Sequence, residues 1–323
     1  MAAEAEGSVP ERVRSSCAWV ASRARFVRID EAELPTYAAA LPPALEPPRP
    51  DPATDLVEAA GEARAAFVIC LDAINFGSGW WPTIRKRPWH SGYLTIAAGL
   101  TGRFRERGPW GAAEFSAIGV AEIATVLGQD PEHPLLADFA AALRDVGEHV
   151  EREHGGRFMA VIEAAHGSAV ALADLLAEWQ AFADVSTYDG RPAPFFKRAQ
   201  IAAADVARIG LASGSVSALV EAEGPPDVDR LTAFADNLVP HVLRLDGVLR
   251  LEPDLEQRIE AGELLEHGSP EEVELRACAV HAVELLAAAT QLSPAEIDSV
   301  LWNRGAAERY KSLPRPRSRN TAY

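Results

Sequence analysis

The hydrophobic positions of the chain recur mainly at intervals of three and four residues, which is the spacing of an amphipathic helix. Alanine and leucine are abundant, whereas runs of β-branched and aromatic residues are few. We therefore predict a mostly α, multi-helix globular fold with at most a minor β element. The expected helices cover residues 13–27, 56–66, 197–211 and 273–286, a short stretch from Asp30 to Ala40, one ending at Leu100, and three or four between residues 115 and 180.

One apolar run, residues 67–71, fits either a buried strand or a continuing helix, because five residues are too few for periodicity to separate them. Helix starts are clearer. Ser269-Pro270 and Ser293-Pro294 place serine at the N-cap and proline at the first helical position, with glutamate two residues after the proline. Ser116, Asp130 and Asp227 are also expected to cap helices, Pro131 to begin one, and Pro240 to kink or end the helix that starts at Asp227 and carries Asp236.

The length of 323 residues allows one large domain or two ordinary ones. We predict a disordered stretch at residues 1–10 and a single mostly helical domain over residues 11–323. Six prolines between Pro42 and Pro52 indicate an extended connector within that domain. The tail, residues 311–323, has no helical pattern after Pro314 and is expected to pack back on the domain.

The net charge of −16 argues against general nucleic-acid binding, which depends on neutralising phosphates with lysine and arginine. A bound phosphate would have to meet a local basic patch. Three widely spaced cysteines suit neither a disulfide framework nor a zinc site, and no apolar run reaches 18 residues. We predict a soluble, cytoplasmic protein without membrane contact. Two basic stretches stand out, Arg85-Lys86-Arg87 and the group Lys311, Arg315, Arg317 and Arg319.

Two stretches combine polar groups with large apolar neighbours. Residues 72–82 hold Asp72, Asn75, glycines and three aromatic side chains, which is typical of a pocket wall or of packing at a bend. Asp236 lies between Phe234 and Leu238, as either a capped or solvated residue or a tuned catalytic acid. The signatures HExxH, GxSxG and the P-loop are absent, and the histidines lack a metal-ligand spacing.

An ordered set of motifs resembles one family, the queuosine salvage proteins, also called queuosine 5′-phosphate N-glycosylases. The similarity covers most of the chain from about residue 18 onward. Glycines separate Phe76 from Trp80-Trp81, which leaves open which tryptophan lines a pocket. The motifs are Asp72-Ala73-Ile74-Asn75-Phe76, Trp81-Pro82, Ser91-Gly92-Tyr93, Phe196-Lys197-Arg198-Ala199-Gln200-Ile201, Phe234-Ala235-Asp236, Val239-Pro240, Glu272-Val273-Glu274-Leu275-Arg276, Leu301-Trp302 and residues 319–323.

The resemblance implies a fold similar to the helix-hairpin-helix DNA glycosylases. It also implies hydrolysis of the N-ribosyl bond of queuosine 5′-monophosphate, which releases queuine for reuse in tRNA modification. Asp236 would be the essential catalytic acid residue and Lys197 would sit in the active site. The expected partner is this small nucleotide, without a stable nucleic-acid complex, and the chemistry needs no metal or redox cofactor.

Cleavage builds positive charge on the sugar carbon, which Asp236 would stabilise or attack. Queuine has carbon in place of the purine N7, so its departure needs help at other edges, for which Asp72 and Asn75 are candidates. Phe76, Trp81 and Tyr93 are expected to stack on the base. Arg198 and the tail from Arg317 to Arg319 are candidates for the 5′-phosphate. The full set of substrate-binding candidates is Asp72, Asn75, Phe76, Trp81, Tyr93, Phe196, Arg198, Trp302, Arg317 and Tyr323.

Three other readings compete with this hydrolase. A helical module that binds queuine or a queuosine nucleotide without cleaving it would tolerate loss of Asp236. A glycosylase acting on tRNA or DNA would need an extended basic groove, which the acidic composition disfavours. A helical scaffold would be supported by internal repeats, and none are present.

Overall fold

The computed structural model describes residues 7–43, 61–208 and 227–323. Over these residues the chain forms fifteen α-helices and four short strands, which confirms the mostly α prediction. The helices are α1 (Val9–Ala21), α2 (Leu34–Ala39), α3 (Gly61–Ala73), α4 (Gly92–Arg107), α5 (Ala112–Ala117), α6 (Val120–Leu127), α7 (Pro134–His154), α8 (Phe158–Ala164), α9 (Ala169–Ala177), α10 (Lys197–Arg208), α11 (Leu238–Leu245), α12 (Pro253–Glu260), α13 (Pro270–Ala288), α14 (Pro294–Arg304) and α15 (Glu308–Lys311). The strands are β1 (Val27–Ile29), β2 (Val185–Tyr188), β3 (Arg191–Pro194) and β4 (Leu249–Leu251), and 3-10 turns occur at η1 (Ser78–Trp80), η2 (Gln180–Phe182) and η5 (Asp227–Arg230).

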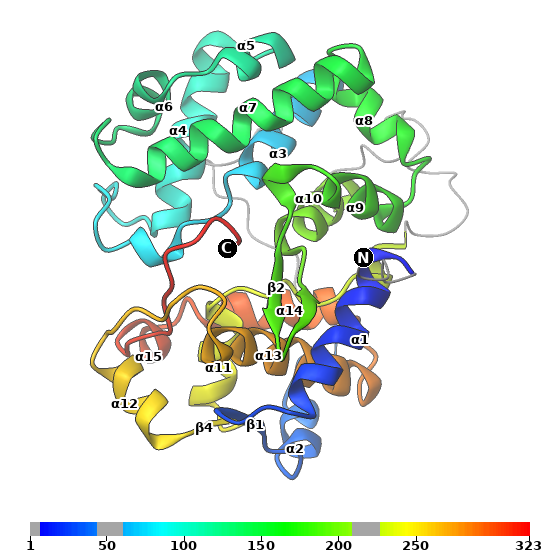
Figure 1. Ribbon diagram of the computed structural model, residues 1–323, viewed down its shortest axis with the longest axis vertical. Helices are drawn as coiled ribbons and strands as arrows, with labels where there is room; N and C mark the ends of the chain where they lie inside the picture. The colour runs from blue at the N-terminus through cyan, green and yellow to red at the C-terminus, as the bar shows by residue number, and fades with distance from the viewer. Residues whose placement is uncertain (1–6, 44–60, 209–226) are drawn as a thin grey trace.

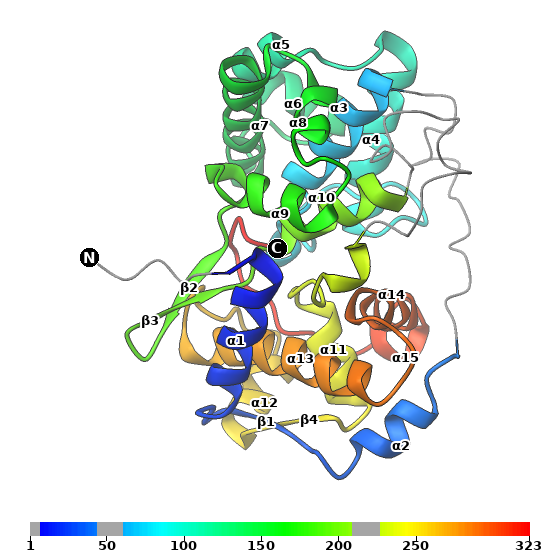
Figure 2. The ribbon, with the colours of Figure 1, turned by 90° about the vertical axis from the view of Figure 1, so that its right-hand side faces the viewer.

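The helices form two groups (Figures 1 and 2). The first group holds α3 to α10, and the second holds α1, α2 and α11 to α15. Helix α13 lies inside the second group, where it packs against α1, α11 and α14. Two antiparallel pairs complete the fold: β1 joins β4, and the hairpin of β2 and β3 runs from the first group alongside α1.

Amphipathic spacing explains the packing of the long helices. In α7, Leu135, Phe139, Leu143, Val146 and Val150 are buried at intervals of three and four residues. Burial of each large apolar side chain contributes about 1.5–3 kcal/mol, which fixes the face that α7 turns inward.

The predicted serine caps are confirmed. Ser269 accepts a hydrogen bond from the backbone N–H of Glu272 and starts α13, whereas Ser293 accepts one from Glu296 and starts α14. The carboxylate of Glu296 in turn accepts the backbone N–H of Ser293 at 2.8 Å, which completes a capping box. These local signals fix both helix starts without help from the rest of the fold.

Tertiary contacts decided other boundaries. The run at residues 67–71, for which strand and helix were both open, continues helix α3. The predicted end of the first helix was wrong, because that helix stops at Ala21 and Val27 belongs to strand β1. The first helix begins at Val9, inside the stretch of residues 1–10 that was predicted to be disordered. Residues 1–6, 44–60 and 209–226 lie outside the described chain. Four predictions fall partly or mostly on them: the disordered stretch 1–10, the proline connector 42–52, and the helices 56–66 and 197–211.

Three predicted caps were also wrong. Ser116 lies inside α5, and five helices instead of three or four occupy residues 112–177. Helix α7 begins at Pro134 with His133 as its cap, so Asp130 and Pro131 only precede it. The carboxylate of Asp227 accepts the backbone N–H of Ala169 at 2.6 Å, so it caps α9 from a distant part of the chain.

The tail from residue 314 to 323 crosses from the second group of helices back to the first (Figure 1). The backbone N–H of Gly77 donates to the carbonyl oxygen of Tyr323 at 2.9 Å. A Cβ atom at Gly79 would lie 2.2 Å from the carbonyl oxygen of Ser318, so only glycine permits this approach of two backbones. The tail is therefore fitted closely to the loop that follows α3.

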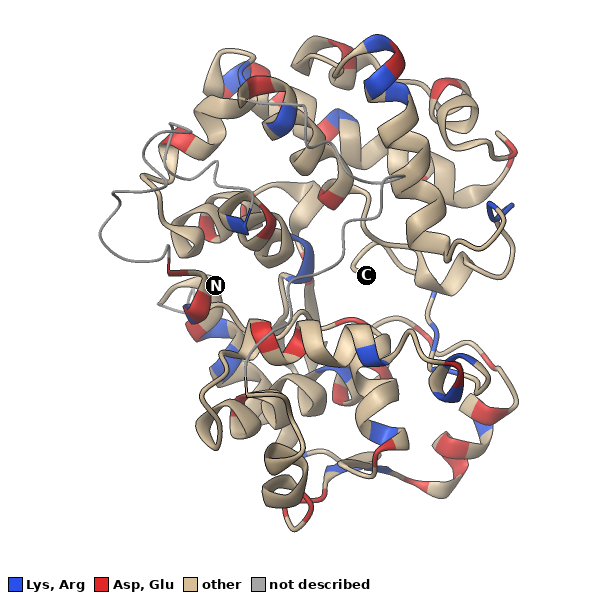
Figure 3. Cartoon of the chain, turned by 180° about the vertical axis from the view of Figure 1, so that it is seen from behind, with Lys and Arg blue, Asp and Glu red and all other residues tan. Residues whose placement is uncertain are grey.

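Charged residues are spread over both groups, with acidic and basic segments interleaved in the view of Figure 3. The three cysteines, Cys17, Cys70 and Cys278, are buried and unpaired. No single helix in the described ranges is long and apolar enough to cross a membrane, although the bent pair α8 and α9 passes that test by length and composition alone.

Candidate active site

Lys197 is the first residue of α10 and is buried between the two groups of helices. Its ammonium donates to the backbone carbonyl of Asn75 at 2.8 Å and lies 3.4 Å from the Asn75 side-chain oxygen. Burial lowers the pKa of Lys197 to about 8, and the negative charge of Asp236 acts in the opposite direction. The structure thus brings three of the predicted site residues, Lys197, Asn75 and Asp236, into one neighbourhood.

Asp236 lies two residues before the start of α11, next to its N-cap residue Asn237, and is only partly buried. Its Oδ1 accepts the backbone N–H groups of Leu238 at 2.8 Å and Val239 at 2.9 Å. These are unsatisfied donors of a helix N-terminus, which suits a negative charge. The prediction that Asp236 lies on a helix interrupted by Pro240 was wrong, because Pro240 occupies the first turn of α11, where a missing N–H is tolerated.

The segment around Asp236 is fixed residue by residue to different parts of the fold. The N–H of Phe234 donates to Asp298 of α14 at 2.9 Å, and the carbonyl of Ala235 accepts from Arg276 of α13 at 3.1 Å. The side-chain amide of Asn237 donates to the carbonyl of Pro316 in the tail at 2.8 Å. Asp236 is therefore held rigidly on both sides, while its second carboxylate oxygen accepts no hydrogen bond from the described residues.

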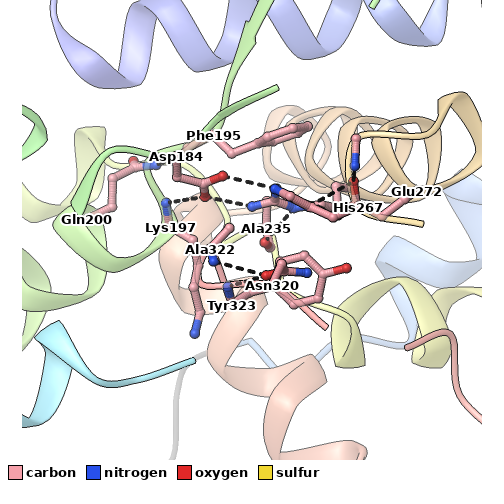
Figure 4. A network of polar contacts seen from close by, with 12 residues as sticks. Asp184, Phe195, Lys197, Gln200, Ala235, His267, Glu272, Asn320, Ala322 and Tyr323 are labelled. Carbon is pink, nitrogen blue, oxygen red and sulfur yellow. Dashed lines mark hydrogen bonds and ion pairs between the residues drawn. The ribbon is translucent and has the colours of Figure 1, made fainter. Parts of the chain in front are cut away.

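A buried ion pair between Arg276 and Asp184 links Ala235, the residue before Asp236, with Lys197; Asp184, Ala235 and Lys197 are labelled in Figure 4. Arg276 donates to the two oxygens of Asp184 at 3.0 and 2.6 Å, and both side chains are 1% exposed. Asp184 also accepts the backbone N–H of Lys197 at 3.2 Å. Since Arg276 binds the carbonyl next to Asp236, one ion pair positions both candidate catalytic residues.

Asp72 lies in the last turn of α3 and is fully buried. One oxygen is 3.4 Å from the side-chain amide of Asn75, and the other has no hydrogen-bond partner. Burial, reinforced by the charge of Asp205, raises the pKa of Asp72 well above its usual range. A buried carboxyl that keeps its proton can donate a hydrogen bond to a bound molecule.

Aromatic side chains from both groups meet beside Asp72. The ring of Tyr93 on α4 packs edge-to-face against that of Trp302 on α14, with centroids 6.2 Å apart. The ring of Trp81 lies against the backbone of Gly92, where a Cβ atom would come within 2.4 Å. Tyr93, Trp81 and Trp302 all keep exposed surface, which leaves their rings available to a flat ligand.

Two of the predicted substrate-binding residues lie in the core instead. Arg198 is fully buried, donates to the backbone carbonyl of Ala73 and places its guanidinium 4.7 Å from the ring of Phe76. Phe76 packs edge-to-face against Phe139, with centroids 4.9 Å apart. These contacts with Ala73, with Phe139 and with each other support a structural role for Arg198 and Phe76.

Three further candidates, Phe196, Tyr323 and Arg317, make contacts with other residues of the protein. Phe196 has a strained backbone with φ of 47°, and its ring faces the guanidinium of Arg12. Tyr323 covers Arg276 at 4.6 Å. Arg317 donates to the carbonyl of Gly262 at 2.9 Å.

Two residues that the sequence analysis did not place in the site lie near Asp236. Burial lowers the pKa of Arg315, and the charge of Asp236 opposes that shift. Asp298 is buried on α14, and its pKa is raised well above the usual range by burial and then by Asp236. A sequence signal for Asp298 existed, because it falls on the apolar face that Pro294, Ile297 and Leu301 define.

No group of three or more histidine, cysteine, aspartate or glutamate side chains in the described ranges is arranged to hold a metal ion. The fold and the site define a helical protein with a fixed carboxylate and a buried lysine, an arrangement suited to chemistry at a sugar carbon that becomes positively charged. Residues 56–323 match the family model described as queuosine salvage protein. The chain belongs to this family.

Curated relatives carry one common name, queuosine 5′-phosphate N-glycosylase/hydrolase. The relative from Sphaerobacter thermophilus is 36% identical over 81% of this chain and 82% of its own length. The relative from Mus musculus is 27% identical over 97% of this chain and 99% of its own, and the one from Dictyostelium discoideum is 28% identical over 81% and 79%.

Proposed function

We propose that this protein hydrolyses the N-ribosyl bond of queuosine 5′-monophosphate and releases queuine for reuse in tRNA modification. The observation that carries the proposal is the carboxylate of Asp236, held at the N-terminus of α11 next to Lys197 in a member of the queuosine salvage family. Negative charge fixed in a poorly hydrated site stabilises a cationic sugar carbon far better than it would in water.

Asp236 acts at C1′ of the ribose. As the bond to the base breaks, its free oxygen either attacks C1′ or stabilises the cation while it takes a proton from the incoming water. Both routes end with the water oxygen on C1′, the bond's electron pair on the base, and one proton delivered to the base. Both also need the rigid support that Arg276 and Asp298 give to residues 234 and 235.

The 5′-phosphate needs cationic partners, and Lys197 and Arg315 are the basic residues whose charges interact with Asp236. On the other side, Trp81, Tyr93 and Trp302 would stack on the deazapurine ring. Asp72 and Asn75 would form hydrogen bonds with its edges. The net charge of −16 supports a small nucleotide over a polynucleotide as substrate, and a cytoplasmic location stays a prediction.

Chromatography of the products tests the proposal. Purified protein is incubated with queuosine 5′-monophosphate, and with GMP, unphosphorylated queuosine and queuosine-containing tRNA in parallel. We expect free queuine from the monophosphate. Asp236→Asn keeps the shape of the side chain but removes its charge, and should lower the rate by on the order of 10³-fold. Asp229→Asn, an exposed acid in η5, is the matched control and should leave the rate unchanged.

Near-normal release of queuine by Asp236→Asn would reject the catalytic assignment. Tight calorimetric binding of the monophosphate by the wild-type protein without release would instead identify a binding module. Release from tRNA alone would identify a glycosylase that acts on polynucleotides.

A further inference from the structure

The departing base needs a proton donor, and Asp298 is placed to be one, in addition to Asp72, which would form a hydrogen bond with an edge of the base. It lies in α14 on the buried face shared with Ile297 and Leu301, and the residue is 5% exposed. Oδ1 accepts the N–H of Phe234 at 2.9 Å. No other hydrogen bond and no ion pair reaches this carboxyl from residues that the structure describes, so Oδ2 is left to carry a proton.

The charges around Asp298 come from two elements packed near it. Asp236, just before α11, lies close enough for its negative charge to oppose ionisation of Asp298. Lys197 and Arg208 of α10 act in the opposite direction, but burial and Asp236 prevail, and the pKa of Asp298 stays well above the usual value. Asp298 therefore keeps its proton under conditions in which an ordinary aspartate is ionised.

Asp236 and Asp298 are thus two nearby carboxyls in different environments. Asp236 is partly exposed and receives two N–H groups from a helix N-terminus, whereas Asp298 is buried and receives one. Pairs of carboxyls whose environments separate their protonation states divide the acid and base roles in glycosidases. The shared segment, residues 234–236, fixes the distance between them.

We propose that Asp298 is a second catalytic carboxyl, which donates its proton to the departing base while Asp236 acts at the ribose carbon. This rests on the proposed hydrolysis of queuosine 5′-monophosphate. The C1′–N bond breaks with its electron pair going to the base, which takes the proton from Oδ2 of Asp298. Water supplies the oxygen that bonds to C1′, and its proton, taken up by Asp236, is returned to Asp298.

A proton donor is needed because queuine lacks N7, so the leaving group cannot be protonated there before the bond breaks. General acid catalysis of this kind contributes about 10²–10⁴-fold. The competing role for Asp298 is only to accept the N–H of Phe234. Asp298→Asn separates the two roles, since its amide oxygen can accept the same hydrogen bond but the amide does not act as an acid.

The test compares two substrates that differ in the leaving group. One is queuosine 5′-monophosphate, and the other is β-ribofuranose 5-phosphate with p-nitrophenol on C1, whose p-nitrophenolate departs without a proton. We expect Asp298→Asn to lower kcat/KM about 10²–10⁴-fold on the nucleotide and less than about tenfold on the aryl riboside. Asp236→Asn should lower both. Asp138→Asn is the matched control, because burial alone raises the pKa of this acid on α7.

Equal effects of Asp298→Asn on the two substrates, whether both small or both large, would overturn the proposal. If this variant does not fold, Asp298→Glu replaces it: retained activity on the nucleotide, well above that of Asp298→Ala, supports the acid role, and equal loss in both rejects it. Failure of the wild-type protein to release queuine would reject the proposed function separately.

Discussion

Arg276 and Asp184 form a buried, bidentate ion pair, with hydrogen bonds of 3.0 and 2.6 Å between the guanidinium and the carboxylate. Each partner also makes a hydrogen bond outside the pair: Arg276 donates to the carbonyl of Ala235, and Asp184 accepts the backbone N–H of Lys197. The rings of Phe195 and Tyr323 cover the guanidinium at 3.9 and 4.6 Å. Stability and positioning of the site therefore depend on the same two side chains.

Arg276→Met should lower the free energy of unfolding by about 3–5 kcal/mol, because it leaves Asp184 buried without its partner. Urea denaturation measures the loss. Arg258→Met is the control, since the ion pairs of Arg258 with Glu263 and Glu271 are partly exposed and should contribute at most about 1 kcal/mol.

The positioning role needs a milder variant. Arg276→Lys keeps the charge, but an ammonium cannot make the bidentate hydrogen bonds to Asp184 and the hydrogen bond to the Ala235 carbonyl at the same time. We expect kcat to fall in this variant while KM and the unfolding midpoint change little. A drop in activity that merely follows the loss of stability would argue that Arg276 only supports the fold.

The rate should fall as pH rises through about 8, because the pKa of Lys197 is lowered to that value and its ammonium is lost above it. Lys197→Arg stays charged, so the fall should move to higher pH, at some loss in rate from the altered shape. Lys311→Arg on exposed α15 is the matched control. The raised pKa of Asp298 also contributes to the pH profile, but only the part that belongs to Lys197 can move in Lys197→Arg. An unmoved profile would exclude Lys197 as the titrating group.

Gly79→Ala should loosen the tail, because the new Cβ would lie 2.2 Å from the Ser318 carbonyl oxygen, and neither backbone can yield cheaply. We expect a loss of about 1–3 kcal/mol in unfolding free energy and faster proteolysis of residues 314–323. Gly102→Ala in α4 is the matched control: no atom lies within 4 Å of its Cβ, so it should stabilise by about 0.5–1 kcal/mol. Equal stability of the two variants would show that the tail does not need the close approach.

Asp72→Asn should stabilise the protein and reduce its activity. The folded-state pKa of Asp72 is raised above its usual value of 3.8, so the wild-type protein loses stability as pH rises from about 4 toward that raised pKa. The amide removes this dependence, and we expect a gain of about 1–2 kcal/mol at pH 7 that disappears near pH 4. Unfolding measured at both pH values checks it, with Asp229→Asn as a control. A gain that is independent of pH would contradict the assignment.

Local chemistry made parts of the fold predictable. The serine and proline pairs that start α13 and α14 were correct because a cap satisfies donors within one turn of itself. The cap at Asp227 was wrong, because its carboxylate binds α9, almost 60 residues earlier in the chain. Residues 67–71 could not be assigned, since the core that makes them helical is assembled from distant segments.

The same distinction holds for the site. Motif resemblance located Asp236, Lys197, Asp72 and Asn75, which the structure brings near one another. Asp298 was not identified from the sequence, because an acid on an apolar helix face indicates a functional site only when the charge next to it, here Asp236, is known. Arg198 was proposed for the 5′-phosphate because of its charge and its place in the motif, but its side chain is buried in the core.

The two groups of helices differ in how the chain supplies them, and this sets an order of assembly. Helices α3 to α10 come from one continuous stretch, whereas α1 packs most extensively on α13, some 250 residues later, and also contacts β3 and α9. During synthesis the first group can fold alone and early, while the second closes last. Lys197 and Asp72 are then synthesised long before Asp236 and Asp298, so an incomplete chain can fold its first group of helices but lacks the carboxylate that acts at the sugar carbon.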